Sequence, residues 1–188
     1  MTSSTSNISE ELKARLIDMA WLLNDFVSDL KTPVDVIFYL RPEMDKSKQN
    51  FMSVSRLCIS SLIISLCKIR EIIDHYGLEI REFPESLRNS LYDIKSKIEK
   101  SDMYAYRSRY VAHSFSKEKG ANQKPLTFDQ NVKSLMKIID FGLEPVTKNV
   151  FAFCDWVHKK DDQGSVVYIV YDTVRHIESV VGDLRTRS

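Results

Sequence analysis

One long helical pattern, covering residues 47–75, constrains the fold of this chain more than any other sequence feature. Apolar side chains recur there at steps of three and four, which places them along one side of an α-helix. The stripe consists of Phe51, Val54, Leu57, Cys58, Leu62, Leu66, Ile69 and Ile73, and Ile59, Ile63 and Ile64 widen it. A stripe this wide predicts the central helix of the fold, buried on most sides. Its strongest apolar run, Leu57–Cys67, is much shorter than the roughly 20 residues that a membrane span needs.

An amphipathic helix is predicted before it, from Ile8 to Leu30. Its apolar side chains also recur at steps of three and four: Leu12, Leu16, Met19, Leu22, Leu23, Phe26 and Leu30. Asn7 and Glu10 have the spacing of a capping box at the start of this helix. Pro33 predicts a break and a new helix start, because proline lacks the N–H that a helix interior uses. We therefore expect Val34–Leu40 to form a separate short helix.

The next helices are delimited by turn residues. Gly77 is a natural stop for the central helix, and Pro84 can open the next one. Apolar residues after Pro84 again keep helical spacing: Leu87, Leu91, Ile94 and Ile98. Ser101 or Asp102 can cap a further helix that reaches about Ser116. The two helices on either side of Ser101 could equally be one continuous helix.

A charged loop at residues 117–126, which contains a glycine and a proline, precedes the last third of the chain. Thr127 and Gln130 have capping-box spacing, which predicts a helix that starts there and ends near Phe141. A helix from about Val146 to His158 is expected after it.

The last segment, Ser165–Leu184, admits two interpretations. Its β-branched residues over Val166–Tyr171 suggest a strand. Its length and the later three and four spacing favour a helix. The chain has only five glycines and five prolines among 188 residues, which also favours helices over a fold with many turns. We therefore predict an all-α, antiparallel up-and-down helical bundle with additional C-terminal helices. One domain is expected over residues 1–188, with residues 1–7 as a disordered tail.

Three cysteines, Cys58, Cys67 and Cys154, lack the even number and the spacing of a disulfide framework or a zinc ribbon. We expect reduced, mostly buried thiols and a cytoplasmic location. The N-terminal residues lack the apolar segment of a signal peptide. Cys154 and His158 lie four apart, but without further ligands nearby we expect no metal site. The formal net charge of +1 excludes a global basic field for nucleic acid.

The stretch YRSRYVAHSF combines arginines, tyrosines and a histidine on a predicted helix. Arg109 and His113 are four apart and share a face. Arg107 and His113 are six apart, which in a straight helix separates them by roughly 120° around the axis and about 9 Å along it. They would meet only at a helix end or across a two-fold axis with a second copy. Tyr106 and Tyr110 could stack on bases, but tyrosines at helical spacing more often belong to a core.

This stretch resembles the HEPN domains, in particular their abortive-infection and toxin-like branch. That branch carries the pattern Arg-polar-x-x-x-Ala-His, which Arg107–His113 fits. The preceding helix, with Arg70 and Asp74 near its end, also looks like the second helix of that branch. Two positions depart from the family. Ser108 stands where the family often has Asn or Asp, and Phe115 stands where some members carry a tyrosine that a partner enzyme modifies.

The resemblance implies a metal-independent endoribonuclease in a phage-defence or toxin–antitoxin setting. In this family the 2′-hydroxyl of RNA attacks the adjacent phosphorus. Arg107 would stabilise the phosphate and His113 would transfer the proton, with Ser108, Arg109 and Tyr110 in support. Which of Arg107 and Arg109 serves the site stays open. No metal and no cofactor is expected.

The partners that the resemblance implies are RNA, a second copy of the chain in a homodimer, and a protein antitoxin. We expect no DNA and no membrane partner. Two other hypotheses about the function remain. A non-catalytic HEPN-like dimeric module would bind RNA, nucleotide or a protein without cleavage, and a structural helical protein would have no site at all.

Overall fold

The computed structural model describes residues 9–44, 47–111, 127–145, 147–182 and 184. All regular elements in these ranges are helices, and no strand occurs among them, so the predicted all-α class is confirmed. The elements are α1 (Glu10–Leu40), η1 (Arg41–Glu43), α2 (Lys48–His75), α3 (Gly77–Arg81), α4 (Glu85–Lys100), α5 (Met103–Tyr106), η2 (Arg107–Val111), α6 (Phe128–Ile138), α7 (Thr147–Val157) and α8 (Val166–Val181). The last segment is thus helical, and the strand interpretation of Val166–Tyr171 is wrong.

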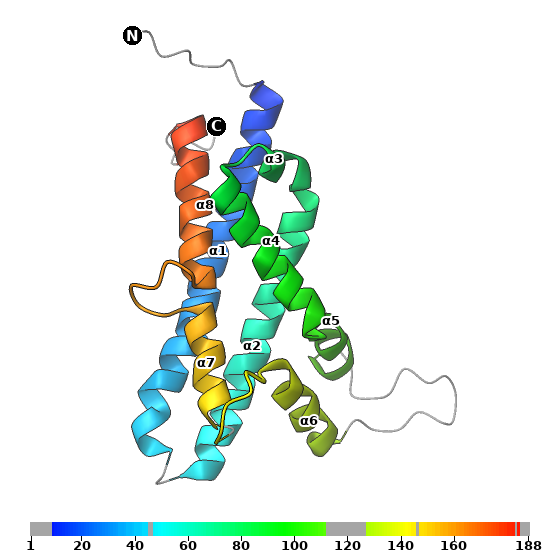
Figure 1. Ribbon diagram of the computed structural model, residues 1–188, viewed down its shortest axis with the longest axis vertical. Coiled ribbons are helices and arrows are strands. Elements are labelled where there is room, and N and C mark those ends of the chain that lie inside the picture. The colour runs from blue at the N-terminus through cyan, green and yellow to red at the C-terminus, as the bar shows by residue number, and fades with distance from the viewer. Residues whose placement is uncertain (1–8, 45–46, 112–126, 146, 183, 185–188) are drawn as a thin grey trace, which may run out of the picture.

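Two long helices, α1 and α2, run along the length of the molecule, and α8 lies beside the half of α1 in which the chain begins (Figure 1). α1 packs against both α2 and α8, and α4 crosses α2 and also contacts α8. α6 lies beside the first turns of α2, at the end opposite to the start of α1. Since α1 and α2 run in opposite directions and a short connection joins them, the arrangement is an antiparallel bundle.

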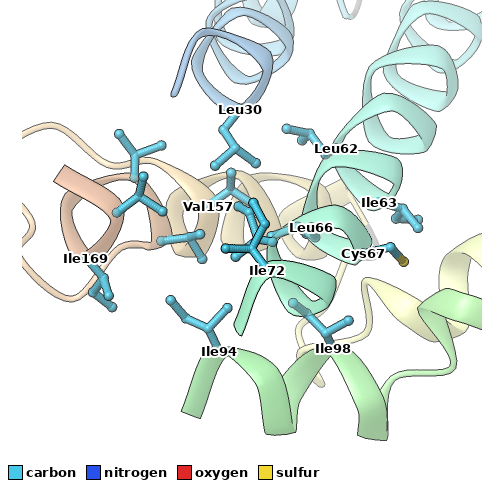
Figure 2. Packing of buried hydrophobic residues seen from close by; sticks show 14 of the residues in the cluster. Leu30, Leu62, Ile63, Leu66, Cys67, Ile72, Ile94, Ile98, Val157 and Ile169 are labelled. Carbon is cyan, nitrogen blue, oxygen red and sulfur yellow. The ribbon is translucent and has the colours of Figure 1, made fainter. Parts of the chain in front are cut away.

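The hydrophobic core lies between α1, α2, α4, α7 and α8. Figure 2 shows Leu30 of α1 and Leu66 of α2 directed toward Val157 of α7, with Ile94 and Ile98 of α4 on another side. All five side chains are buried. α2 therefore has neighbours on several sides, as its wide apolar stripe predicts.

Leu57 is an exception to that stripe, because 60% of its surface is exposed. The buried side of α2 passes instead through Ser55 and Ile59. Leu57 is two residues from each of them, which on an α-helix is roughly 200° around the axis. The expectation that Leu57 belongs to the core is therefore wrong.

Pro33 lies inside α1, so the predicted helix break is also wrong. α1 is continuous over 31 residues. The buried apolar stripe of α1 continues past the proline, through Leu30, Val34 and Ile37. Packing of that stripe offsets the lost hydrogen bond, which together with the ring clash costs about 3 kcal/mol in a helix interior.

Capping residues define two helix starts. Ser9 caps α1, and its side chain accepts a hydrogen bond from the Leu12 N–H at 3.2 Å. Asn7, the predicted cap, lies outside the described residues. The capping box at the start of α6 is confirmed: the Gln130 side chain accepts from the Thr127 N–H at 3.1 Å, and the Thr127 hydroxyl accepts from the Gln130 N–H at 3.3 Å.

α2 ends at His75, as predicted, and Gly77 follows its C-cap residue Tyr76 and opens the short helix α3. The chain turns there because the side chains of Tyr76 and Ile80 are buried. Downstream, Asp102 adopts a left-handed conformation with φ 58° and separates α4 from α5. The alternative of one continuous helix through residue 101 is therefore excluded.

α2 is the single helix, within the described ranges, that is long and apolar enough to cross a membrane by length and composition. Its most apolar 18-residue window has a mean hydropathy of 1.6, and 44% of that window is buried inside the structure. The short apolar run considered from the sequence is thus part of a longer apolar segment. The core helix of a globular bundle has the same properties, and α2 packs on α1 and α4.

An ion pair ties α1 to α3. Glu79 is only 6% exposed, and its carboxylate accepts a hydrogen bond from Arg15 Nε. That hydrogen bond holds the pKa of Glu79 below its ordinary value. Because the pKa is lowered by folding, the pair stabilises the fold at neutral pH, and this contribution is lost as pH falls through the lowered pKa.

We therefore expect Glu79→Gln to lose less unfolding free energy on acidification than the wild type, below the ordinary glutamate pKa of 4.5. Urea denaturation at a series of pH values measures this, with exposed Glu85→Gln as the control for loss of one carboxylate. Identical pH slopes for Glu79→Gln and the wild type would contradict the prediction.

Candidate functional site

The segment that carries the arginines directly follows the short helix α5. Met103 and Tyr106 of α5 are almost completely buried, and they fix this short helix against the bundle. The chain then continues directly into η2, which carries Arg107, Ser108 and Arg109. His113 and Phe115 lie outside the described residues.

Tyr106 connects three helices. Its hydroxyl lies 2.9 Å from Ser60 Oγ on α2 and donates to Asn131 Oδ1 on α6 at 3.1 Å. Its ring packs on the half-buried ring of Tyr110, with 5.5 Å between the centroids. Tyr106 is therefore a core residue with a satisfied hydroxyl, and its ring is not free to stack on a base.

η2 is a π-helix, whereas the sequence predicts an α-helix through these residues. A π-helix forms hydrogen bonds between residues five apart and is rare, and single π turns occur frequently at functional sites. The wider turn changes which side chains share a face. The α-helical angles that the sequence analysis assumes therefore do not apply to residues 107–111.

Arg107 is held by α2. Its Nη1 donates to Glu71 Oε1 at 2.6 Å, and its side chain keeps 34% of its surface exposed. The hydrogen bond to Glu71 raises the pKa of Arg107 further, so the guanidinium stays charged. Arg107 is thus oriented by one carboxylate and still reachable from solvent.

Two neighbours of this pair carry no charge at neutral pH. Tyr104 donates to the Cys67 carbonyl at 2.7 Å, and its hydroxyl lies 3.4 Å from Glu71 Oε1. Burial, and then the charge of Glu71, raise the pKa of Tyr104 to about 12. Burial likewise raises the pKa of the Cys67 thiol to about 11, although Arg107 opposes this. Tyr104 therefore acts as a neutral hydrogen-bond donor, and Cys67 is no nucleophile here.

Arg70 and Asp74 form a separate ion network with α4. Arg70 Nη1 lies 2.6 Å from Asp74, and Arg70 Nη2 lies 2.9 Å from Glu99. Lys95 also contacts Asp74, at 2.6 Å. These groups join α2 to α4, so Arg70 and Asp74 are occupied in packing.

Arg109 lies on a different side of η2 from Arg107. It is exposed and lines a polar cavity of about 150 Å³ between α5, η2 and α6. Lys137 of α6 and Asp102 lie in the same lining and form an ion pair at 2.7 Å. A hydrogen bond from Lys137 lowers the pKa of Asp102. The two arginines therefore face different surroundings, Arg107 toward α2 and Arg109 toward α6.

Sequence reasoning missed Glu71, Tyr104, Asn131 and Lys137. Glu71 lies 36 positions from Arg107, and no spacing rule links residues so far apart. A cue exists for Glu71, because it is a carboxylate on the helix that the HEPN resemblance already includes. Asn131 had no cue.

No group of three or more metal-ligating side chains occurs among the residues that the structure describes. Cys154 is fully buried, and burial raises the pKa of its thiol to about 12. Burial also lowers the pKa of His158. The pair of Cys154 and His158 is therefore part of the packing of α7.

Comparison with known proteins gives one result. A family model described as the HEPN-like integron domain matches residues 16–144, more than half of the chain. The matched range contains α2, α4, α5 and η2 completely. Neither the curated proteins nor the solved structures contain a match.

Proposed function

This chain belongs to the HEPN-like integron domain family, and on that premise we propose that it is a metal-independent endoribonuclease. The observation that carries the proposal is the placement of Arg107. It lies on a π turn, is oriented by Glu71 at 2.6 Å, and remains one-third exposed. The proposed setting is phage defence or a toxin–antitoxin pair, which rests on the HEPN resemblance of Arg107–His113.

The guanidinium of Arg107 suits a phosphate. It has five N–H donors in one plane, and Glu71 is bonded to Nη1. The remaining donors can bind two oxygens of a phosphate at once, which a lysine cannot do. Glu71 therefore acts as a positioning residue, and Arg107 stabilises the negative charge that builds up on the phosphorane.

The proposed reaction needs no added reactant. The 2′-oxygen of RNA forms a bond to the adjacent phosphorus, and the bond from phosphorus to the 5′-oxygen breaks. The products are a 2′,3′-cyclic phosphate and a 5′-hydroxyl, and the proton from the 2′-hydroxyl ends on the 5′-oxygen. We assign this proton transfer to His113, since histidine titrates near neutral pH.

The proposal includes a homodimer. Arg107 and His113 would come together at the interface of two copies, as the HEPN resemblance implies. A protein antitoxin would then act by covering the site that Arg107 and His113 form. Ser108 and Tyr110 adjoin the arginines on η2 and would shape the same surface.

The test is cleavage of a single-stranded RNA in the presence of a chelator. We expect fragments with 2′,3′-cyclic phosphate ends and no cleavage at a position whose 2′-hydroxyl is replaced by hydrogen, because the nucleophile is then absent. A mock purification from cells without the protein controls for contaminating nucleases.

Two outcomes would contradict the proposal. Cleavage that stops with the chelator, or that continues at the deoxy position, indicates another mechanism. RNA binding without any cleavage, across several RNAs, favours instead the non-catalytic HEPN-like module.

A further inference from the structure

A second site lies away from Arg107, between the first turns of α2 and the helices α6 and α7. It is a cavity of about 290 Å³. Its floor consists of Ile59, Leu135 and Val150, all of them buried. Phe128 forms part of the rim and is 66% exposed. The cavity is thus mostly apolar and open at one side.

Two polar groups in this lining lack a partner. Ser55 is 4% exposed, and its Oγ is buried without a hydrogen bond. Arg56 Nε is also buried without a hydrogen bond. Both residues line the cavity. Since a buried polar group without a partner costs about 1–3 kcal/mol, such groups are normally satisfied by something.

The charge of the lining identifies the kind of ligand. Among the described residues of the lining, Arg56 alone is charged, and the other side chains are apolar or neutral. The guanidinium of Arg56 lies over the Phe128 ring at 5.5 Å, which places the charge at the rim. A ligand with one negative head and an apolar body matches this distribution.

The size of the cavity limits the body of the ligand. An apolar cavity of about 150 Å³ holds one benzene molecule. The present cavity is nearly twice that volume and so fits a bicyclic ring system or a chain of similar bulk. A nucleotide would bring many polar groups into an apolar lining, which is unfavourable. A protein partner would need an interface that buries on the order of 1,000 Å² of surface, far more than a small cavity offers.

We propose that this cavity binds a small amphipathic carboxylate, whose carboxylate group pairs with the guanidinium of Arg56 and with the hydroxyl of Ser55. The apolar body lies on Ile59, Leu135 and Val150. This site goes beyond the proposed RNA cleavage and does not depend on it, because its test measures binding alone.

The experiment titrates the full chain with 2-naphthoate by calorimetry. Comparison ligands are 2-naphthylmethylamine, which is cationic at neutral pH, 2-naphthamide, which is neutral, and acetate, which has the head without the body. We expect binding of naphthoate, with the amine and acetate weaker by at least about tenfold, since both the charged hydrogen bond and the apolar contact contribute.

Variants test the residues. Arg56→Gln is expected to weaken naphthoate binding by about tenfold or more. Arg175→Gln, on the exposed side of α8, is the matched control and is expected to leave it unchanged. Val132→Trp, also in the lining, fills the cavity and is expected to abolish binding without touching either donor.

Ser55→Ala covers the case in which Arg56→Gln does not fold. Its Oγ makes no hydrogen bond in the structure, so the variant is expected to fold and to bind naphthoate several-fold more weakly. The proposal is overturned if naphthoate does not bind at millimolar concentration. It is also overturned if the amine binds as tightly as naphthoate, or if Arg56→Gln and Ser55→Ala both bind it like the wild type.

Discussion

Replacement of His113 by alanine is expected to lower metal-free RNA cleavage by about 100- to 10,000-fold, the usual contribution of a positioned acid or base. Arg107→Ala is expected to lower it by about 100- to 1,000-fold, because one donor to the transition state is lost. Initial rates on one RNA, measured in the presence of a chelator, give both values. The RNA dissociation constants of the variants show that the loss lies in the chemical step.

Control variants separate the two arginines. Arg107→Lys keeps the charge but loses the planar fork, so an intermediate rate is expected. Arg175→Ala removes an arginine from α8, away from η2, and is expected to have wild-type activity. If Arg109→Ala is inactive while Arg107→Ala cleaves normally, the phosphate-binding role belongs to Arg109 and its cavity on the α6 side.

Mixing the two inactive variants tests the assembly. In a mixed dimer of Arg107→Ala and His113→Ala, one composite site recovers an intact Arg107 from one protomer and an intact His113 from its partner. Activity should then return if the site is shared between protomers. If both residues of a site come from the same protomer, the mixture stays inactive.

Phe153→Ala is expected to destabilise the fold by about 3–5 kcal/mol. Phe153 of α7 is completely buried and packs against Trp156, with 5.7 Å between the ring centroids. Its removal leaves a cavity that the surrounding helices can fill only in part. Urea denaturation measures the change in unfolding free energy.

Phe128→Ala is the matched control for Phe153→Ala. Phe128 is the same residue type but is mostly exposed, so its removal is expected to change stability by less than about 1 kcal/mol. Equal losses for the two variants would show that α7 does not form part of the core.

Local patterns predicted most of the secondary structure. The apolar stripes of α1, α2 and α4 follow from residue spacing, and the Thr127 capping box marks a helix start within four residues of sequence. Hydrogen bonds inside a helix join residues four apart, so these features depend on neighbours in the chain. The predicted helix break at Pro33 failed because packing of α1 against other helices outweighed a local preference.

The sequence by itself determined the helical class, the central place of α2, and the Arg107–His113 pattern that led to the HEPN family. The tertiary structure decided that Arg107 is oriented by Glu71, that Arg109 lines a cavity on the α6 side, and that Arg70 is engaged with Glu99. The reason is physical. Helix formation is governed by residues within one or two turns, whereas the partner of a side chain on η2 is set by how α5 and η2 cross α2 and α6.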